Sequence, residues 1–200
     1  MKKVLEVIAS ARGAESFSTK LADHIVSKIS EKYDGSSVIK KDIVDSKIPH
    51  LNPDILAAFF TPLENQADSI KGLDAFSNKA IKELQEADTI VIAVPFYNFG
   101  IPSVLKAYID HVAVGGKTFK YIDGAPVGLL TGKKVYLAIS SGGVYSEGDY
   151  KAYDFTEPYL RTVLGFLGMT DVTTFRIEGL NVSALKDRAV EKGLNSVVID

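Results

Sequence analysis

The most constraining feature of this sequence is an alternation of short apolar runs with longer stretches of helical periodicity. The apolar runs predict five buried or half-buried strands, at residues 4–9, 36–43, 89–94, 133–140 and 172–177. Between these runs, apolar residues recur every three or four positions, as at Leu21, Ile25 and Ile29, which predicts amphipathic helices. Strand–helix repetition of this kind is typical of a parallel sheet covered by helices.

We therefore expect an α/β fold: a three-layer, doubly wound, five-stranded parallel sheet in the flavodoxin-like order 2-1-3-4-5. The chain has 200 residues, of which 46% are hydrophobic, and this predicts a single domain over residues 1–200. The helix after the first strand is expected to be capped by Ser18, and a helix from 183 to about 198 to close the chain. Residues 44–66 hold three prolines and are too long for a simple connection, so they form either a functional excursion or a short helix.

Composition excludes several classes of protein. The absence of cysteine excludes disulfides and thiolate metal sites, and the three histidines are too far apart to suggest a metal site. The formal net charge is −2 with no basic run, so we expect no nucleic-acid partner. No apolar segment approaches the roughly 18 residues that span a bilayer. The N-terminal apolar run is interrupted by Glu6 and is too short for a signal peptide, which predicts a cytoplasmic protein without a membrane partner.

The loop after the first predicted strand has the composition of an anion site. In an open parallel sheet, ligands bind outside the carboxyl ends of the strands where the strand order reverses, which here means strands 1, 3 and 4. Ser10, Ser16, Phe17 and Ser18 bring hydroxyls and backbone N–H groups to the start of a helix, where phosphates bind readily. An ordinary serine-capped helix is the alternative interpretation.

The loops after the third and fourth predicted strands are also unusual. The first of these carries Phe96, Tyr97, Asn98 and Phe99, whose rings and amide suit a planar heteroaromatic ligand, although core packing is the alternative. The second, residues 140–143, ends in two glycines, which let a backbone approach a ligand, although a plain turn is the alternative. Together the three loops favour a site for flavin mononucleotide (FMN).

The chain resembles the FMN-dependent NADH azoreductases, which are flavodoxin-like homodimers that also reduce quinones. The resemblance runs essentially end to end and is carried by Tyr97-Asn98-Phe99, the serine loop, and the segments 118–121, 128–134, 140–143, 158–160 and 164–168. It implies one FMN per subunit. The residues that it implies for the cofactor are Ser10, Ser16, Phe17, Ser18, Phe96, Tyr97, Asn98, Phe99, Ser140, Ser141, Gly142 and Gly143.

The resemblance also implies the reaction. NADH gives a hydride to the flavin and leaves, and a quinone or azo acceptor then takes two electrons in the same place, in a ping-pong sequence. No basic cluster is placed for the 2′-phosphate of NADPH, which favours NADH. We assign no catalytic side chain, although Tyr121 and Tyr145 are candidate hydrogen-bond donors near the ring. A flavodoxin-type electron carrier that does not oxidise NADH is the alternative function.

The irregular segment gains a role from the expected homodimer. Phe59 and Phe60 lie within residues 44–66, and leaving both in water would expose an apolar patch. We expect this segment and the predicted loop 115–128, with Tyr121, to form a wall over the flavin and substrate of a partner subunit. A surface loop folded over its own core is the alternative.

Overall fold

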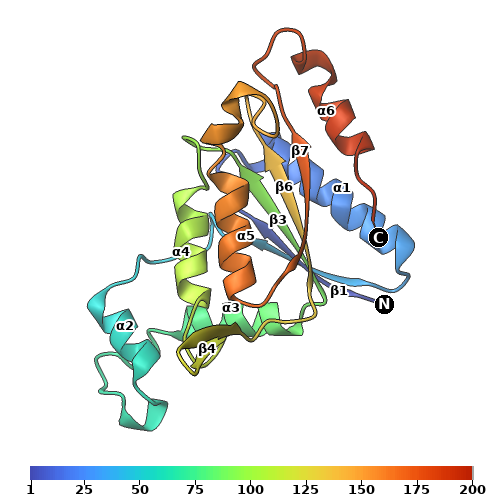
Figure 1. Cartoon of the computed structure of the whole chain (residues 1–200). Coiled ribbons are helices and arrows are strands. Elements are labelled where there is room, and N and C mark those ends of the chain that lie inside the picture. Colours follow the sequence, from blue (N-terminus) through green and yellow to red (C-terminus); the bar gives the residue numbers. More distant parts are fainter. Residues whose placement is uncertain (200) are drawn as a thin grey trace.

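A computed structural model describes residues 1–199 and places five parallel strands in one sheet (Figure 1). The strands are β1 (Lys3–Ile8), β2 (Ser37–Asp42), β3 (Thr89–Pro95), β6 (Lys134–Ser140) and β7 (Asp171–Ile177). Their order is β2-β1-β3-β6-β7, which is 2-1-3-4-5 when the strands of this sheet are numbered alone. The predicted flavodoxin-like order is confirmed. Asp200, the last residue of the expected domain, lies outside the described residues.

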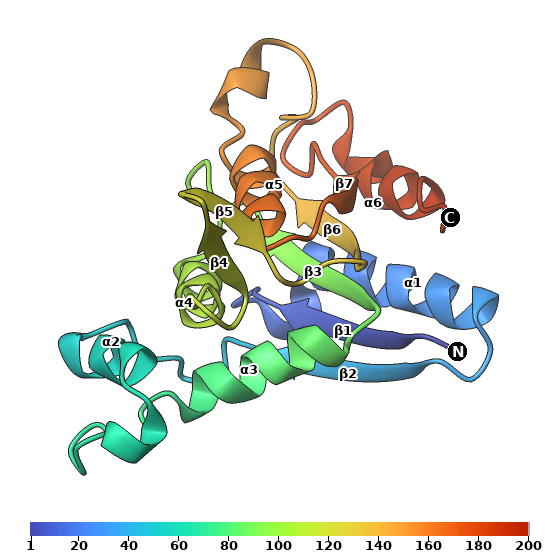
Figure 2. The ribbon, with the colours of Figure 1, turned by 60° about the horizontal axis from the view of Figure 1, so that its bottom comes forward.

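The two faces of the sheet carry different helices (Figure 2). On one face, α1 (Phe17–Lys32) and α6 (Lys186–Asn195) pack on apolar side chains of β1, β3, β6 and β7. On the other, α3 (Ala75–Glu86), α4 (Ser103–Val112) and α5 (Thr156–Phe166) cover a second apolar cluster. Every residue of β3 is buried because the strand lies at the centre of the sheet, whereas β2 lies at an edge and is largely exposed. Within residues 1–199 no helix has the length and apolar character needed to cross a bilayer.

The helix after β1 begins earlier than predicted. Ser16 has an extended backbone, with φ −78° and ψ 123°, and its Oγ accepts a hydrogen bond of 3.2 Å from the Thr19 N–H. Ser16 is therefore the cap, and Ser18 lies fully buried in the first turn. The predicted cap was wrong because Ser18 sits two residues too far along, where its hydroxyl contacts that of Ser16.

Residues 119–128 form a β-hairpin where we expected a loop. Its strands, β4 (Phe119–Ile122) and β5 (Ala125–Gly128), pair antiparallel outside the main sheet. Asp123 and Gly124 connect them with positive φ angles of 52° and 79°, as a two-residue hairpin turn requires.

The irregular segment contains a short helix, as one of the two alternatives predicted. Helix α2 (Pro53–Phe60) is capped by Asn52 and begins with proline, and the 3₁₀ turn η2 (Leu63–Asn65) follows. Figures 1 and 2 both show this segment projecting away from the sheet. Its base is tied down by the buried His111 of α4, which lies 2.8 Å from the Pro49 carbonyl and 2.7 Å from the Ser77 hydroxyl. Two further 3₁₀ turns, η1 (Gly13–Glu15) and η3 (Asp149–Tyr153), flank the carboxyl ends of the strands.

The sheet holds one buried carboxyl group whose pKa is strongly shifted. Glu6 in β1 is 1% exposed, and its Oε1 has no hydrogen-bond partner. Burial, followed by the nearby charge of Asp23, raises the pKa of Glu6 from its ordinary 4.5 to about 7, although Lys40 lies 3.6 Å away and opposes the shift. The protonated form is therefore preferred by the folded state.

We predict that Glu6→Gln stabilises the protein at alkaline pH. A carboxyl group with a raised folded-state pKa contributes its full stability below about pH 4.5 and loses it as the pH rises through about 7. Denaturant unfolding at pH 8 should show the variant more stable by on the order of 3 kcal/mol, with most of the difference gone at pH 5. Glu191→Gln, at an exposed position of α6, is the control. A difference that does not change with pH would contradict the assignment.

Candidate functional site

A cavity of about 540 Å³ lies at the carboxyl ends of β1, β3 and β6. The register of the sheet pairs Ile8 with Ala93 and Pro95 with Ser140, so the loops that follow these three strands start side by side. The segment after β7 and the start of α6 close the remaining side. The lining residues are Ser10, Arg12, Ser16, Phe17, Pro95, Phe96, Tyr97, Ser140, Ser141, Gly142, Leu180, Asn181, Lys186 and Val190.

One end of the cavity is rich in hydrogen-bond donors. Ser10 and Ser16 line it with hydroxyls, and α1 starts there. The first helical hydrogen bond of α1 runs from the Lys20 N–H to the Ser16 carbonyl. The N–H groups of Phe17 and Ser18 precede it and therefore have no carbonyl partner within the helix. These donors and the helix dipole favour an anion at this end.

The other end is formed by a strained turn. Tyr97 and Gly100 exchange backbone hydrogen bonds of 3.0 and 2.9 Å, and Asn98 and Phe99 between them have φ angles of 49° and 69°. Two positive φ angles in succession define a type I′ turn, a conformation that suits asparagine but is unfavourable for phenylalanine. The turn leaves Phe99 49% exposed at the rim while Phe96 and Tyr97 line the cavity.

Gly142 lets the backbone of the loop after β6 approach Asn181 closely. A Cβ atom at this position would lie 2.5 Å from the side-chain nitrogen of Asn181, which also lines the cavity. The backbone reinforces this close approach because the Asn181 N–H donates to the Gly142 carbonyl at 2.8 Å. Any side chain at position 142 would therefore displace Asn181 from the wall of the cavity.

The ring of Phe96 is supported from behind by Tyr145. The two rings stack with centroids 4.2 Å apart, and Tyr145 is not among the lining residues. The Tyr145 and Ser146 N–H groups donate to Glu178 Oε1 at 2.8 and 3.0 Å. Arg176 in turn contacts Glu178 at 3.3 Å.

Arg176 joins three segments through ion pairs. Besides Glu178, its guanidinium binds Asp154 and Glu157, both at 2.5 Å. Asp154 also accepts from the Thr156 and Glu157 N–H groups at the start of α5. Burial acts to raise the pKa of Glu157, but hydrogen bonds from Arg176, Thr174 and Arg161 outweigh it, and that pKa is lowered. Burial acts to lower the pKa of Arg176, but its hydrogen bonds to Glu157 and Asp154 outweigh this effect, and that pKa is raised. The cluster fixes the loop that carries Tyr145.

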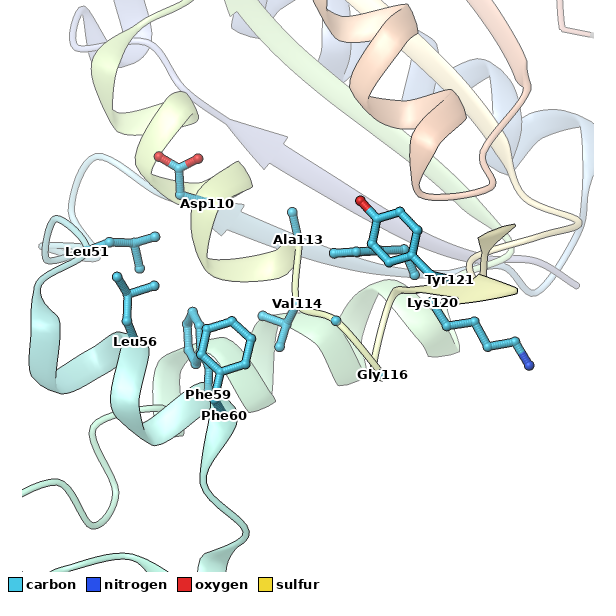
Figure 3. Close-up of a pocket in the computed structure, with 12 residues that line it drawn as sticks. Leu51, Leu56, Phe59, Phe60, Asp110, Ala113, Val114, Gly116, Lys120 and Tyr121 are labelled. Atoms are coloured by element: carbon cyan, nitrogen blue, oxygen red, sulfur yellow. The ribbon is translucent and has the colours of Figure 1, made fainter. Parts of the chain in front are cut away.

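A second cavity, of about 470 Å³, lies between α2, the end of α4 and the hairpin (Figure 3). Phe59 and Phe60 of α2 lie on one side of it and Tyr121 of β4 on the other, as Figure 3 shows. Phe60 is 78% exposed and Tyr121 64% exposed. Residues of both segments, 44–66 and 115–128, thus line one cavity of this chain, and the expected wall over the flavin of a partner subunit stays a prediction. Among the residues that the structure describes, the second cavity shares no lining residue with the first.

Comparison with known proteins identifies the family. A family model described as a flavodoxin-like fold matches residues 2–198. The chain belongs to this family. Among curated relatives, it is 45% identical over 198 residues to the FMN-dependent NADH:quinone oxidoreductase of Herminiimonas arsenicoxydans, covering 98% of this chain and 97% of that protein. It is 42% identical over 197 residues to the FMN-dependent NADH:quinone oxidoreductase of Beijerinckia indica subsp. indica, covering 98% of each.

Solved structures of the flavodoxin-like family agree with these relatives. An azoreductase from Bacillus anthracis str. Sterne matches with a TM-score of 0.90 and 32% identity, covering 98% of this chain and 96% of that one. An FMN-dependent NADH-azoreductase from Bacillus anthracis str. Ames Ancestor, in complex with FMN, matches with a TM-score of 0.83 and 25% identity, covering 97% of each chain. The resemblance to azoreductases predicted from the sequence is confirmed.

Most of the predicted cofactor residues line the first cavity. The structure brings together eight of them: Ser10, Ser16, Phe17, Phe96, Tyr97, Ser140, Ser141 and Gly142. It does not place four others on the wall. Ser18 is buried beneath Ser16, Asn98 and Phe99 form the turn at the rim, and Gly143 packs against the Tyr145 ring.

Sequence reasoning missed the polar residues Arg12, Asn181 and Lys186 of the lining. It also missed the apolar lining residues Pro95, Leu180 and Val190. Arg12 stands within the serine loop, so its charge was a visible signal. Asn181 and Lys186 follow the fifth strand of the sheet, outside the three loops that the strand order singles out, and only the folded chain brings them to the cavity.

We predict that Glu178→Gln loosens the loop behind Phe96 in this flavodoxin-like fold. The variant removes a charge that faces Arg176 and weakens the bonds from the Tyr145 and Ser146 N–H groups. Its unfolding free energy should fall by about 1–3 kcal/mol, measured by denaturant titration. Glu147→Gln, at an exposed position of the same loop, should change it by less than about 0.5 kcal/mol. Equal effects of the two variants would contradict the role of Glu178 in fixing this loop.

Proposed function

We propose that this protein is an FMN-dependent NADH oxidoreductase that reduces quinones and azo compounds by two-electron transfer. The observation that carries the proposal is the first cavity, where hydroxyls, aromatic rings and a thin glycine loop meet at the carboxyl ends of β1, β3 and β6. The relatives and solved structures named above carry the corresponding activities in their names. We also propose that residues 1–200 form a single FMN-binding domain.

The lining of the cavity suits FMN in its charge and in its aromatic side chains. No aspartate or glutamate is among the described residues that line it, whereas Arg12 and Lys186 are. A phosphate dianion therefore meets hydroxyls, helix N–H groups and positive charge without a facing carboxylate. At the other end, Phe96 and Tyr97 offer aromatic faces to a planar ring.

The side chains position the reaction rather than perform it. Bound FMN supplies the chemistry, since it accepts a hydride and passes on two electrons. Phe96 and Tyr97 would hold the ring, and the backbone around Gly142 would line its polar edge. Because no Asp, Glu or His lies among the described lining residues, we propose that solvent supplies the protons. Neither Tyr121, in the second cavity, nor Tyr145, behind Phe96, lines the first cavity of its own chain.

We further propose that the protein works as a homodimer. The second cavity is flanked by two exposed rings, that of Phe60 on the segment that projects from the sheet and that of Tyr121 on the hairpin. Large exposed apolar patches mark interaction surfaces. A second copy that covers this patch would let Phe59, Phe60 and Tyr121 form a wall over the substrate of its partner. The cytoplasmic location expected from the sequence stays a prediction.

An anaerobic titration with NADH separates the enzyme from the electron carrier. FMN-loaded protein should lose its visible flavin absorbance rapidly and completely after about one NADH per flavin, because a hydride carries two electrons. Adding a quinone should restore the absorbance. Flavin that binds but stays oxidised with NADH would instead support a carrier served by a partner reductase.

Phe60→Ser tests the homodimer. Removing this ring takes an apolar anchor from the proposed interface, so sedimentation should show a larger monomer fraction, and quinone reduction should fall by about tenfold or more. FMN affinity should persist because Phe60 does not line the first cavity. Val198→Ser, at an exposed apolar position near the C-terminus, is the matched control. A single monomeric species for the unmodified protein would refute the dimer.

A further inference from the structure

We propose that Arg12 and Lys186 form a phosphate-reading pair, which makes the first cavity select flavins that carry a terminal phosphate. The inference rests on the proposed FMN function and concerns which flavin the site accepts. Arg12 comes from the loop after β1, and Lys186 is the first residue of α6. Although far apart in the sequence, both line the same cavity.

Both cations lack a partner of opposite charge. Within residues 1–199, neither side chain forms an ion pair, although Glu15 and Asp187 lie close to them in the sequence. By contrast, Arg176 binds three carboxylates, and Lys40 lies between Glu6 and Asp23. Two unpaired cations on a wall without carboxylates leave a local positive charge in a chain whose net charge is −2.

The two residues suit a phosphate in different ways. The guanidinium of Arg12 lies 5.9 Å from the centroid of the Phe17 ring, and Phe17 also lines the cavity. This cation–π contact steadies the guanidinium while leaving its N–H groups available for bidentate binding. Lys186 adds a compact charge at the start of α6, where the N-terminal end of the helix dipole also favours an anion.

The serine hydroxyls alone would discriminate less strongly between FMN and riboflavin. Ser16 Oγ already accepts from the Thr19 N–H and contacts Ser18 Oγ, and Ser10 Oγ accepts from the Arg12 N–H at 3.3 Å. A phosphate monoester carries about −1.5 to −2 charges at neutral pH, whereas riboflavin has a neutral hydroxyl at the same place. Cations add attraction for the phosphate that the hydroxyl does not share, so they select FMN over riboflavin.

The test is a binding titration of the apoprotein with FMN and with riboflavin, followed by flavin fluorescence at low and high salt. We expect the unmodified protein to prefer FMN. Lys186→Ala should weaken FMN binding by about tenfold, the scale of one charge-assisted hydrogen bond, while riboflavin binding changes by less than about twofold. Combining it with Arg12→Ala should bring the two affinities together and reduce the salt dependence of FMN binding.

Two controls separate charge from packing. Lys186→Arg keeps the charge and should retain the preference for FMN. Lys192→Ala removes an exposed lysine from the same helix, outside the first cavity, and should leave both affinities unchanged.

Several outcomes would contradict the proposal that Arg12 and Lys186 select FMN. Equal losses for FMN and riboflavin would assign the residues to packing, and unchanged FMN affinity with a raised KM for NADH would assign them to the dinucleotide. If the unmodified protein bound both flavins equally, the proposed selection by Arg12 and Lys186 would be wrong, whereas the proposed FMN function would not be contradicted. If it bound neither flavin, both proposals would fail.

Discussion

Parallel pairing of β1 with β3 and of β3 with β6 determines where every part of the first cavity begins. In a parallel sheet neighbouring strands end at the same edge, and here the register pairs Ile8 with Ala93 and Pro95 with Ser140. Each strand is held there by burial on both faces, since the apolar side chains of β3 contact α1 on one side and α3 and α4 on the other. The site is thus a consequence of the core, and a slipped strand would separate the serine loop from the aromatic turn.

The sequence predicts the parts of this protein that depend on short-range pattern. Five apolar runs were sufficient for the strands and their order, and eight of the cofactor residues predicted in the loops after three of them line the cavity. The hairpin was missed although Asp123-Gly124 is a strong hairpin signal, because its strands are short and largely exposed and so lack an apolar run. Asn181 and Lys186 were missed for a different reason: they reach the cavity only through the path of the chain after β7, which no local pattern encodes.

Part of the resemblance to azoreductases reflects packing rather than cofactor binding. Gly128 and Gly168 bring the hairpin and the end of α5 into backbone contact, and a Cβ atom at Gly128 would lie 2.1 Å from the Gly168 nitrogen. Lys133 donates to the Gln85 and Ala87 carbonyls at 2.8 and 2.7 Å and so satisfies the C-terminal end of α3. A motif shared with a family of enzymes therefore need not belong to the site, and contacts decide which residues do.

The two ends of the first cavity depend on different interactions. At the anion end, hydroxyls and helix N–H groups come from the loop after β1 and the start of α1 and act on charge, which is common to any phosphate-bearing ligand. At the ring end, an unfavourable turn conformation at Phe99 is sustained by surrounding contacts: its carbonyl accepts from the Phe155 N–H at 3.1 Å, and Phe96 is backed by Tyr145. Changes in the loop that carries Tyr145 can reshape the ring end while the anion end stays intact. On this argument, acceptor preference can diverge between relatives that keep the same cofactor.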